Sequence, residues 1–365
     1  MIGAVINGRY QIVSELGSGG YGQVYKVQDL KYKTQKAIKL SKSHQSLLSE
    51  YKILRDLQGE GIPKVFKYGE YNFCSFFIMQ LLGNNLYTLL RSNQIGSDSI
   101  LNILFQCLQR IEYIHNKSYI HRDIKPHQFV TGNNNQIYLL DFGISTKYTI
   151  DKCHITSQSS CRFVGSCHFA SMNAHIGLRL TRRDDLESFV YSAIFLITKT
   201  LPWIENSAIN EFNKWNLVFR CKREMLQSAP KNYPEEILEM LRYATSLKFE
   251  ETPDYQYLKE LIKKMGKNIG PCEIQTKARL TQHKRHSLRE KTRIHNKRPS
   301  VKILKTKSKT VLQNQIPIPN LLSHSNISTN HNTSLEETEK GSLPELSLNL
   351  RNLLHKSSKT RKTFK

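Results

Sequence analysis

Two short motifs constrain this chain more than any other feature of its sequence. The first is the run His121-Arg122-Asp123-Ile124-Lys125-Pro126, and the second, Asp141-Phe142-Gly143, begins eighteen residues after Asp123. An aspartate with a lysine two positions later offers a proton acceptor and a cation, and carboxylate oxygens are ligands that Mg²⁺ prefers. The two motifs therefore predict a site that moves a proton and stabilises concentrated negative charge.

A glycine-rich loop lies near the start of the chain. Gly17-Ser18-Gly19-Gly20-Tyr21-Gly22 fits the pattern G-x-G-x-x-G, and the next residues, Gln23 to Val27, have the composition of a β-strand. A dinucleotide-binding loop would open a helix instead. The strand favours a flap over nucleotide phosphates, although the loop by itself fits a plain glycine hairpin equally well.

Two charged residues follow this loop. Lys39 closes the strand-like run Ala37-Ile38-Lys39, seventeen residues after Gly22, and Glu50 lies in a helical segment further on. Each residue alone would be read as a solvated surface charge. In this order behind a glycine loop, they predict a lysine that grips phosphates and a glutamate that pairs with it.

The complete series of motifs resembles the protein kinases. The resemblance implies an α+β fold with a β-rich lobe over about residues 1–82 and an α-rich lobe over about 83–265. It implies that Asp123 accepts the proton of the attacking hydroxyl, that Lys125 neutralises the transferred phosphate, and that Asp141 and Gln128 hold Mg²⁺ or Mn²⁺. ATP is then expected to contact Leu16, Gly17, Gly19, Gly22, Val24, Ala37, Lys39, Met79 and Leu82.

Longer strings narrow the resemblance to the casein kinase 1 family over about residues 10–262. Ser171-Met172-Asn173 is close to that family's Ser-Ile-Asn, which stands where other kinases have Ala-Pro-Glu. The strings that are also similar are Arg182–Ser188, Arg110–His115, Leu201–Trp203 and Pro253–Tyr255. The resemblance implies transfer of the ATP γ-phosphate to Ser or Thr hydroxyls of acidic or already phosphorylated proteins, without prior phosphorylation of the activation segment. It also implies a gatekeeper at Met79 and an adenine-binding hinge from Gln80 to Gly83.

Several positions depart from the family pattern. Gln128 replaces the metal-binding Asn with a carboxamide that is one methylene longer, and His127 beside it is expected to add positive charge. His168 replaces an arginine of a phosphate-binding pocket and lacks the bidentate fork, which weakens the expected preference for phosphorylated substrates. The other basic residues considered for that pocket are Lys222 and Arg223, which align with it, and Arg162, Arg182 and Arg183, which lie near in sequence.

Hydrophobic periodicity outlines the expected elements. Strands are predicted at Tyr10–Val13, Gln23–Val27, Lys36–Leu40 and Phe76–Met79, and helices at Gln45–Leu57, Ile100–His115, Asp184–Thr198, Glu235–Leu247 and Tyr255–Met265. The longest apolar run, Phe189 to Ile197, is too short to span a bilayer and predicts a buried helix.

The last 100 residues have a different composition. They hold 21 Lys and Arg against 6 Asp and Glu, so 15 of the 24 net positive charges lie there. This composition predicts a disordered basic tail from residue 266 to 365, which favours contact with acidic or phosphorylated partners, anionic surfaces or nucleic acid. We expect a monomer without a transmembrane segment. Seven cysteines without a C-x-x-C pair favour the cytoplasm, the nucleus or both.

Three functional hypotheses stay open at this point. The first is an active serine/threonine kinase of casein kinase 1 type, which the intact Lys39, Asp123, Lys125 and Asp141 favour. The second is a weakly active or inactive pseudokinase scaffold, which Gln128 favours. The third makes the basic tail dominant, with the kinase domain tethered to nucleic acid or to an anionic membrane.

Overall fold

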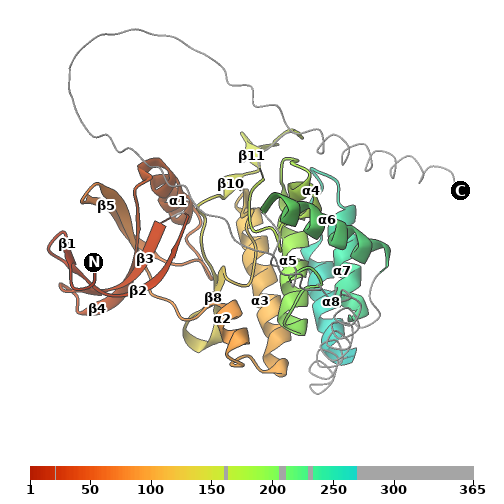
Figure 1. Ribbon diagram of the computed structural model, residues 1–365, viewed down its shortest axis with the longest axis horizontal. Helices are drawn as coiled ribbons and strands as arrows, with labels where there is room; N and C mark the ends of the chain where they lie inside the picture. The colour runs from red at the N-terminus through yellow and green to blue at the C-terminus, as the bar shows by residue number, and fades with distance from the viewer. Residues whose placement is uncertain (21, 160–162, 205–210, 229–232, 269–365) are drawn as a thin grey trace, which may run out of the picture. The chain divides into compact units, whose positions relative to one another are not determined.

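The computed structural model describes residues 1–20, 22–159, 163–204, 211–228 and 233–268. Almost all of the predicted basic tail lies outside these residues, as do Tyr21, Cys161 and Arg162. Within them, a strand-rich lobe is followed by a helical lobe, which confirms the predicted two-lobed α+β architecture (Figure 1).

The N-terminal lobe is a six-stranded antiparallel sheet in the order β1-β2-β3-β4-β6-β5. Its strands are β1 (Val5–Ile6), β2 (Tyr10–Gly19), β3 (Gly22–Asp29), β4 (Thr34–Ser41), β5 (Val65–Tyr71) and β6 (Cys74–Met79). All four predicted strands are confirmed, each within a longer element. The strands β1 and β5 were not predicted, because one is two residues long and the other lacks a regular alternation of apolar and polar side chains.

Alternation along the central strands divides the side chains of this sheet between two faces. Ile38 and Leu40 of β4 belong to a small core enclosed by the curled sheet. Ala37 belongs to the main core on the other face, and Lys39 lies two residues further on that same face. Strand alternation therefore directs Lys39 away from the small core and toward the rest of the molecule.

A single helix, α1 (His44–Asp56), packs against this second face (Figure 1). Its buried residues are Leu47, Glu50, Ile53 and Leu54, which recur at the helical spacing of three and four. Glu50 thus lies on the apolar stripe of the helix. The stripe that packs the helix onto the sheet also brings this carboxylate toward β4.

The C-terminal lobe is mainly helical. Its described helices are α2 (Leu86–Arg91), α3 (Ser97–Asn116), α4 (Met172–His175), α5 (Arg182–Thr198), α6 (Glu211–Gln227), α7 (Glu235–Ser246) and α8 (Tyr255–Asn268). The structure confirms the predicted helices, with bounds that differ by up to three residues. Helix α5 is buried along nearly its whole length and contacts α3 and α7, as predicted for the run Phe189 to Ile197. Among the described residues, no helix is both long and apolar enough to cross a membrane.

Short pairs of antiparallel strands lie between α3 and α4 in the chain. They are β7 (Tyr119–Ile120) with β10 (Thr146–Lys147), β8 (Phe129–Thr131) with β9 (Ile137–Leu139), and β11 (Thr149–Ile150) with β12 (Cys153–His154). The loop between β7 and β8 contains the first sequence motif, and the second follows β9 directly. The pairing of β8 with β9 places the ends of both motif-bearing loops side by side.

Candidate active site

A cleft of about 630 Å³ contains most of the predicted site residues. All nine residues expected to contact ATP line it, together with Glu50, Gln128 and Asp141. The predicted gatekeeper and hinge, Met79 to Gly83, line it as well. Asp123 and Lys125 are not among the lining residues and lie beside the cleft, where Gln128 connects to Asp123.

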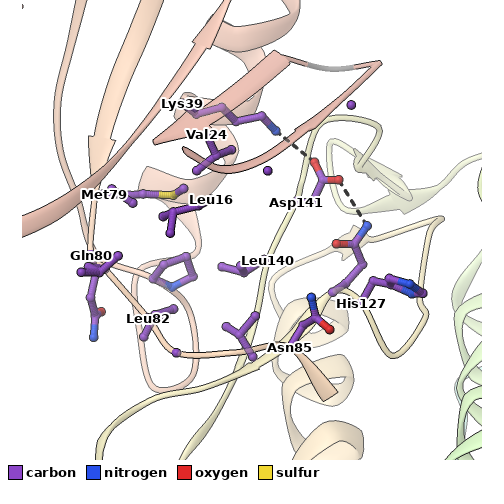
Figure 2. Close-up of a pocket in the computed structure, with 18 of the residues that line it drawn as sticks. Leu16, Val24, Lys39, Met79, Gln80, Leu82, Asn85, His127, Leu140 and Asp141 are labelled. Atoms are coloured by element: carbon purple, nitrogen blue, oxygen red, sulfur yellow. Dashed lines mark hydrogen bonds and ion pairs between the residues drawn. The ribbon is translucent and has the colours of Figure 1, made fainter. Parts of the chain in front are cut away.

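The cleft has an apolar part, and the sequence predicted its residues from the N-terminal lobe and the hinge but not those from the C-terminal lobe. Leu16, Val24 and Ala37 come from the sheet, and Figure 2 shows Leu16 and Val24 directed into the same space as Leu140. Val130 and Leu140 line the cleft from the C-terminal lobe and were missed. Leu140 directly precedes the Asp141 motif, and this position was the available signal. Apolar side chains from both lobes make a slot suited to a flat ring such as adenine.

The glycine loop connects β2 to β3 above this slot. Gly22 has a φ of +129°, and a Cβ there would lie 2.2 Å from the carbonyl oxygen of Leu40, so only glycine fits. Gly17, Gly19 and Gly20 have no atom within 4 Å of the place a Cβ would occupy. One glycine is therefore required by the fold, while the others leave open room over the cleft for a close approach by phosphates.

Lys39 joins the two lobes. Its Nζ donates to both carboxylate oxygens of Glu50 at 2.8 Å and to Oδ1 of Asp141 at 3.1 Å, and Figure 2 shows Lys39 and Asp141 directed toward one another. Burial lowers the pKa of Lys39, but the two carboxylates raise it by more, so the ammonium remains charged. Burial alone would raise the pKa of Asp141, but the attraction of Lys39 outweighs this effect, so the pKa is lowered. The predicted Lys39–Glu50 pair is therefore present and reaches the second motif.

Asp123 and Lys125 form a close pair on the loop between β7 and β8, His121 to Gln128, here called the catalytic loop. Lys125 Nζ donates to Asp123 Oδ2 at 2.7 Å and to the hydroxyl of Ser166 at 2.6 Å. The other carboxylate oxygen, Asp123 Oδ1, is buried and accepts no hydrogen bond from the residues that the structure describes. A buried anionic oxygen without a donor is costly, so it marks the place where a donor from outside the chain, such as a hydroxyl, fits.

Gln128 bridges the two aspartates. Its Nε2 donates to Asp123 Oδ2 at 3.0 Å and to Asp141 Oδ2 at 3.2 Å. A carboxamide offers an oxygen as well as this amino group, and the two can exchange places by rotation about the last side-chain bond. The carboxylate of Asp141 and, once the side chain is turned, the carboxamide oxygen of Gln128 are ligands of the type that Mg²⁺ takes. With Gln128 turned in this way, the two residues would fit a Mg²⁺ ion.

The contacts of His127 do not favour the positive charge expected there, although the residue is exposed. Its ring stacks on Tyr87 with 4.1 Å between ring centroids. Burial first, and Lys125 second, lower the pKa of His127 to about 4. The imidazole is therefore neutral near pH 7, and the charge balance around Gln128 is set by the aspartates and lysines alone.

Asp185 of α5 supports the catalytic loop from below, a role that sequence patterns did not reveal. Its carboxylate accepts the backbone N–H groups of His121 at 2.7 Å and Arg122 at 2.8 Å, and it also accepts from Nε2 of His115 at 2.9 Å. Burial raises the pKa of Asp185, but these hydrogen bonds lower it by more, so the carboxylate stays ionised. Arg122 has a φ of +70°, a conformation that bulky residues adopt only where surrounding contacts enforce it.

The strings that carried the narrower family resemblance bond to each other. Ser171 Oγ and Asn173 Nδ2 both donate to Asp184 Oδ1, at 2.7 and 2.9 Å. The backbone N–H of Met172 donates to Glu187 at 2.8 Å. The Ser-Met-Asn segment is thereby fixed to the start of α5, which also carries Asp185 under the catalytic loop.

Among the described residues, most of the basic side chains considered for a phosphate-binding pocket make structural contacts instead. Lys222 is fully buried and donates to backbone carbonyls, while Arg182 donates to Tyr148 and Glu250 and Arg183 to Leu247. Burial, with Lys214 and Lys222 nearby, lowers the pKa of His168 to about 4. The alignment of Lys222 with such a pocket is therefore wrong, because its side chain is fully buried, and Arg182 and Arg183, which only lie near in sequence, make structural contacts instead. Arg223 is partly exposed, and Arg162 lies outside the described residues.

One comparison with known proteins bears on this geometry. A family model of the protein kinase domain matches residues 10–268. The match begins at the first residue of β2 and ends at the last residue of α8. It therefore covers both lobes, the cleft between them and every residue described above.

Proposed function

This chain belongs to the protein kinase family, and we propose that it is an active serine/threonine kinase of casein kinase 1 type. The observation that carries the proposal is one continuous set of contacts, from Glu50 through Lys39 and Asp141 to Gln128 and Asp123. Each member has the chemistry that phosphoryl transfer requires at its position. A scaffold would have no need to keep all of them in mutual contact.

Protein kinases use ATP and Mg²⁺, and the cleft suits both. The apolar slot would take adenine beside the hinge, with the phosphates under the glycine loop. Lys39 would bind the α- and β-phosphates, and Glu50 would orient it. Asp141 and Gln128 would hold the metal, which neutralises charge on the β- and γ-phosphates when it is bound.

Asp123 is suited to orient the acceptor. A Ser or Thr hydroxyl would donate to the unpartnered Oδ1, and its oxygen would attack the γ-phosphorus. The bond from that phosphorus to the β–γ bridging oxygen breaks, ADP leaves, and the hydroxyl proton passes to Asp123. Lys125 would stabilise charge on the transferred group, held in place by Ser166.

Two observations support the narrower assignment. Lys125 is the mark of the serine/threonine class, and the Ser-Met-Asn segment bonds to Asp184 where other kinases use a different string.

Arg122 donates its Nε to the carbonyl of Ile144, and Ser166 is already bonded to Lys125. These contacts hold the described residues at the two ends of the activation segment by groups of the protein itself, which supports activity independent of activation-segment phosphorylation.

A pseudokinase scaffold is the second candidate, and Gln128 is the observation that favours it. Its amino group lies between Asp123 and Asp141, where a metal ligand must present oxygen. If the longer side chain cannot turn its oxygen toward a metal at about 2.0–2.1 Å, transfer fails although nucleotide still binds.

Phosphate transfer by the full chain distinguishes the two candidates. We would incubate it with γ-labelled ATP, Mg²⁺ or Mn²⁺ and an acidic protein, beside an Asp123→Asn variant as the matched blank. The proposal predicts label on Ser and Thr of the acceptor, well above the blank. Transfer no greater than that of Asp123→Asn would favour the scaffold, and label on Tyr would overturn the serine/threonine assignment.

A further inference from the structure

Lys222 of α6 lies inside the protein although it carries a charge. It is 0% exposed, and its Nζ donates to the carbonyl oxygens of Ala170 at 2.6 Å and Cys167 at 3.2 Å. It also donates to Nε2 of His175 at 3.1 Å. Two of these three acceptors are backbone carbonyls of the segment Gly165–Ser171, here called the acceptor loop.

The surroundings of Lys222 are favourable for the aliphatic part of its side chain and unfavourable for a charged ammonium group. The ammonium lies 4.5 Å from the ring centroid of Tyr191 and 5.3 Å from that of Trp203, and it forms no ion pair with the described residues. Burial lowers the pKa of Lys222 to about 7, against the attraction of Glu187. A well-packed apolar side chain at such a position is often at least as stabilising. The presence of a lysine here is therefore better explained by its hydrogen bonds to the acceptor loop than by a contribution to stability alone.

The acceptor loop connects Lys222 to the catalytic residues. Trp203 also holds the acceptor loop, because its Nε1 donates to the carbonyl of His168 at 2.9 Å. At the other end of the loop, Ser166 accepts from Lys125 at 2.6 Å. Gly165 has a φ of +89°, and a Cβ there would lie 2.6 Å from the carbonyl oxygen of Arg122, so the loop lies directly against the catalytic loop.

We propose that Lys222 is a positioning residue, which fixes the acceptor loop against Asp123 and so presents the substrate hydroxyl, and that it is not a ligand for a phosphate on the substrate. The proposal deepens the kinase function above and rests on it. A displacement of about 1 Å at this loop would misplace the acceptor and slow transfer about 100-fold. The resemblance to casein kinase 1 would instead place Lys222 in the substrate-phosphate pocket, which its burial contradicts.

Two kinetic measurements distinguish these roles. Lys222→Met keeps the stem length and removes the donor, Lys222→Arg restores donors, and Arg220→Met, at an exposed position of the same helix, is the control. We expect Lys222→Met to lower kcat/KM about tenfold or more, by the same factor for an acceptor peptide and for its phosphoserine-containing form. The KM for ATP should stay within about twofold of the wild-type value, Lys222→Arg should regain part of the loss, and Arg220→Met should behave as wild type. A loss confined to the phosphoserine peptide would overturn the proposal.

Hydrogen exchange provides a readout that does not depend on activity. The amides of Phe169 and Ala170 both donate to the carbonyl of Ser166 at 2.9 Å, so their exchange reports on the acceptor loop. In Lys222→Met they should exchange about tenfold faster or more, while the amides of α5 keep their protection. Unchanged exchange in the loop, or equally faster exchange throughout α5, would overturn the proposal. If the wild-type chain transferred no phosphate, the proposed function would fail while this measurement still decided the role of Lys222.

Discussion

Replacing Asp185 by Asn tests how the catalytic loop is held. The carboxylate accepts three hydrogen bonds of 2.7 to 2.9 Å, from the backbone of His121 and Arg122 and from His115. An Asn side chain keeps one acceptor oxygen and turns an amino group toward the remaining donors. Oδ2 accepts two of the bonds and Oδ1 one, so Asn loses at least one hydrogen bond to a charged acceptor, which contributes about 1.5–3 kcal/mol. We therefore expect the unfolding free energy to fall by about 2 kcal/mol, a sizeable share of a typical 5–15 kcal/mol.

The same substitution should reduce activity. Without Asp185, the left-handed backbone of Arg122 is no longer enforced, and Asp123 follows it in the chain. A shift of about 1 Å there predicts a fall in kcat of about 100-fold with little change in the KM for ATP. Urea unfolding followed by the fluorescence of the buried Trp203 measures the stability. Asp56→Asn is the control, because Asp56 is exposed and accepts one hydrogen bond, from Tyr119. If Asp185→Asn stayed within about 1 kcal/mol of the wild type and kept its kcat, the support assigned to Asp185 would be wrong.

Three further perturbations follow from the contacts of the segment that precedes α5. Gly165→Ala should lower kcat about tenfold or more without changing nucleotide binding, because the new Cβ would meet the carbonyl oxygen of Arg122; an unchanged kcat would contradict the close approach. Ser171→Ala should lower the unfolding free energy by about 1–3 kcal/mol, because Asp184 loses a donor and α4 loses its cap; an unshifted urea midpoint would argue against it. Burial holds the pKa of His175 in the folded protein well below 6.5. As the pH falls below 6.5, the unfolded chain takes up a proton at this histidine that the folded protein does not, so the free energy of unfolding decreases. The wild-type unfolding free energy should therefore drop between pH 6.5 and 5 more steeply than that of His175→Gln, by about 1.4 kcal/mol per pH unit, and parallel curves would refute this.

Local sequence patterns were enough to predict the parts of the site that are local in the chain. The glycine loop, Lys39 and the two aspartate motifs each lie within one strand or one turn, so their order and spacing determined their places. Glu50 was also accessible, because helix periodicity puts it on the buried stripe of α1. These residues meet in the structure as the kinase resemblance implied.

Burial of charged and polar residues was not accessible from the sequence. Helix α6 was missed because Lys222 occupies one of its inward positions, between the buried Phe219 and Met225, and a lysine interrupts an apolar stripe. His127 was expected to add positive charge, although its ring stacks on Tyr87 and its pKa is lowered. Asp185 could not be connected to the catalytic loop, because more than sixty residues separate them and only the tertiary structure brings them together.

The magnesium dependence of phosphate transfer tests the central claim, that Gln128 leaves this site active. The initial rate would be measured across a Mg²⁺ titration for the wild type, Gln128→Asn and Gln128→Ala, with Asp123→Asn as the blank. We predict that the wild type transfers phosphate above the blank, that Gln128→Asn changes the half-saturating Mg²⁺ concentration by less than about tenfold, and that Gln128→Ala raises it by more. A wild-type rate equal to the blank, with transfer appearing only in Gln128→Asn, would contradict the account and make the natural chain a scaffold.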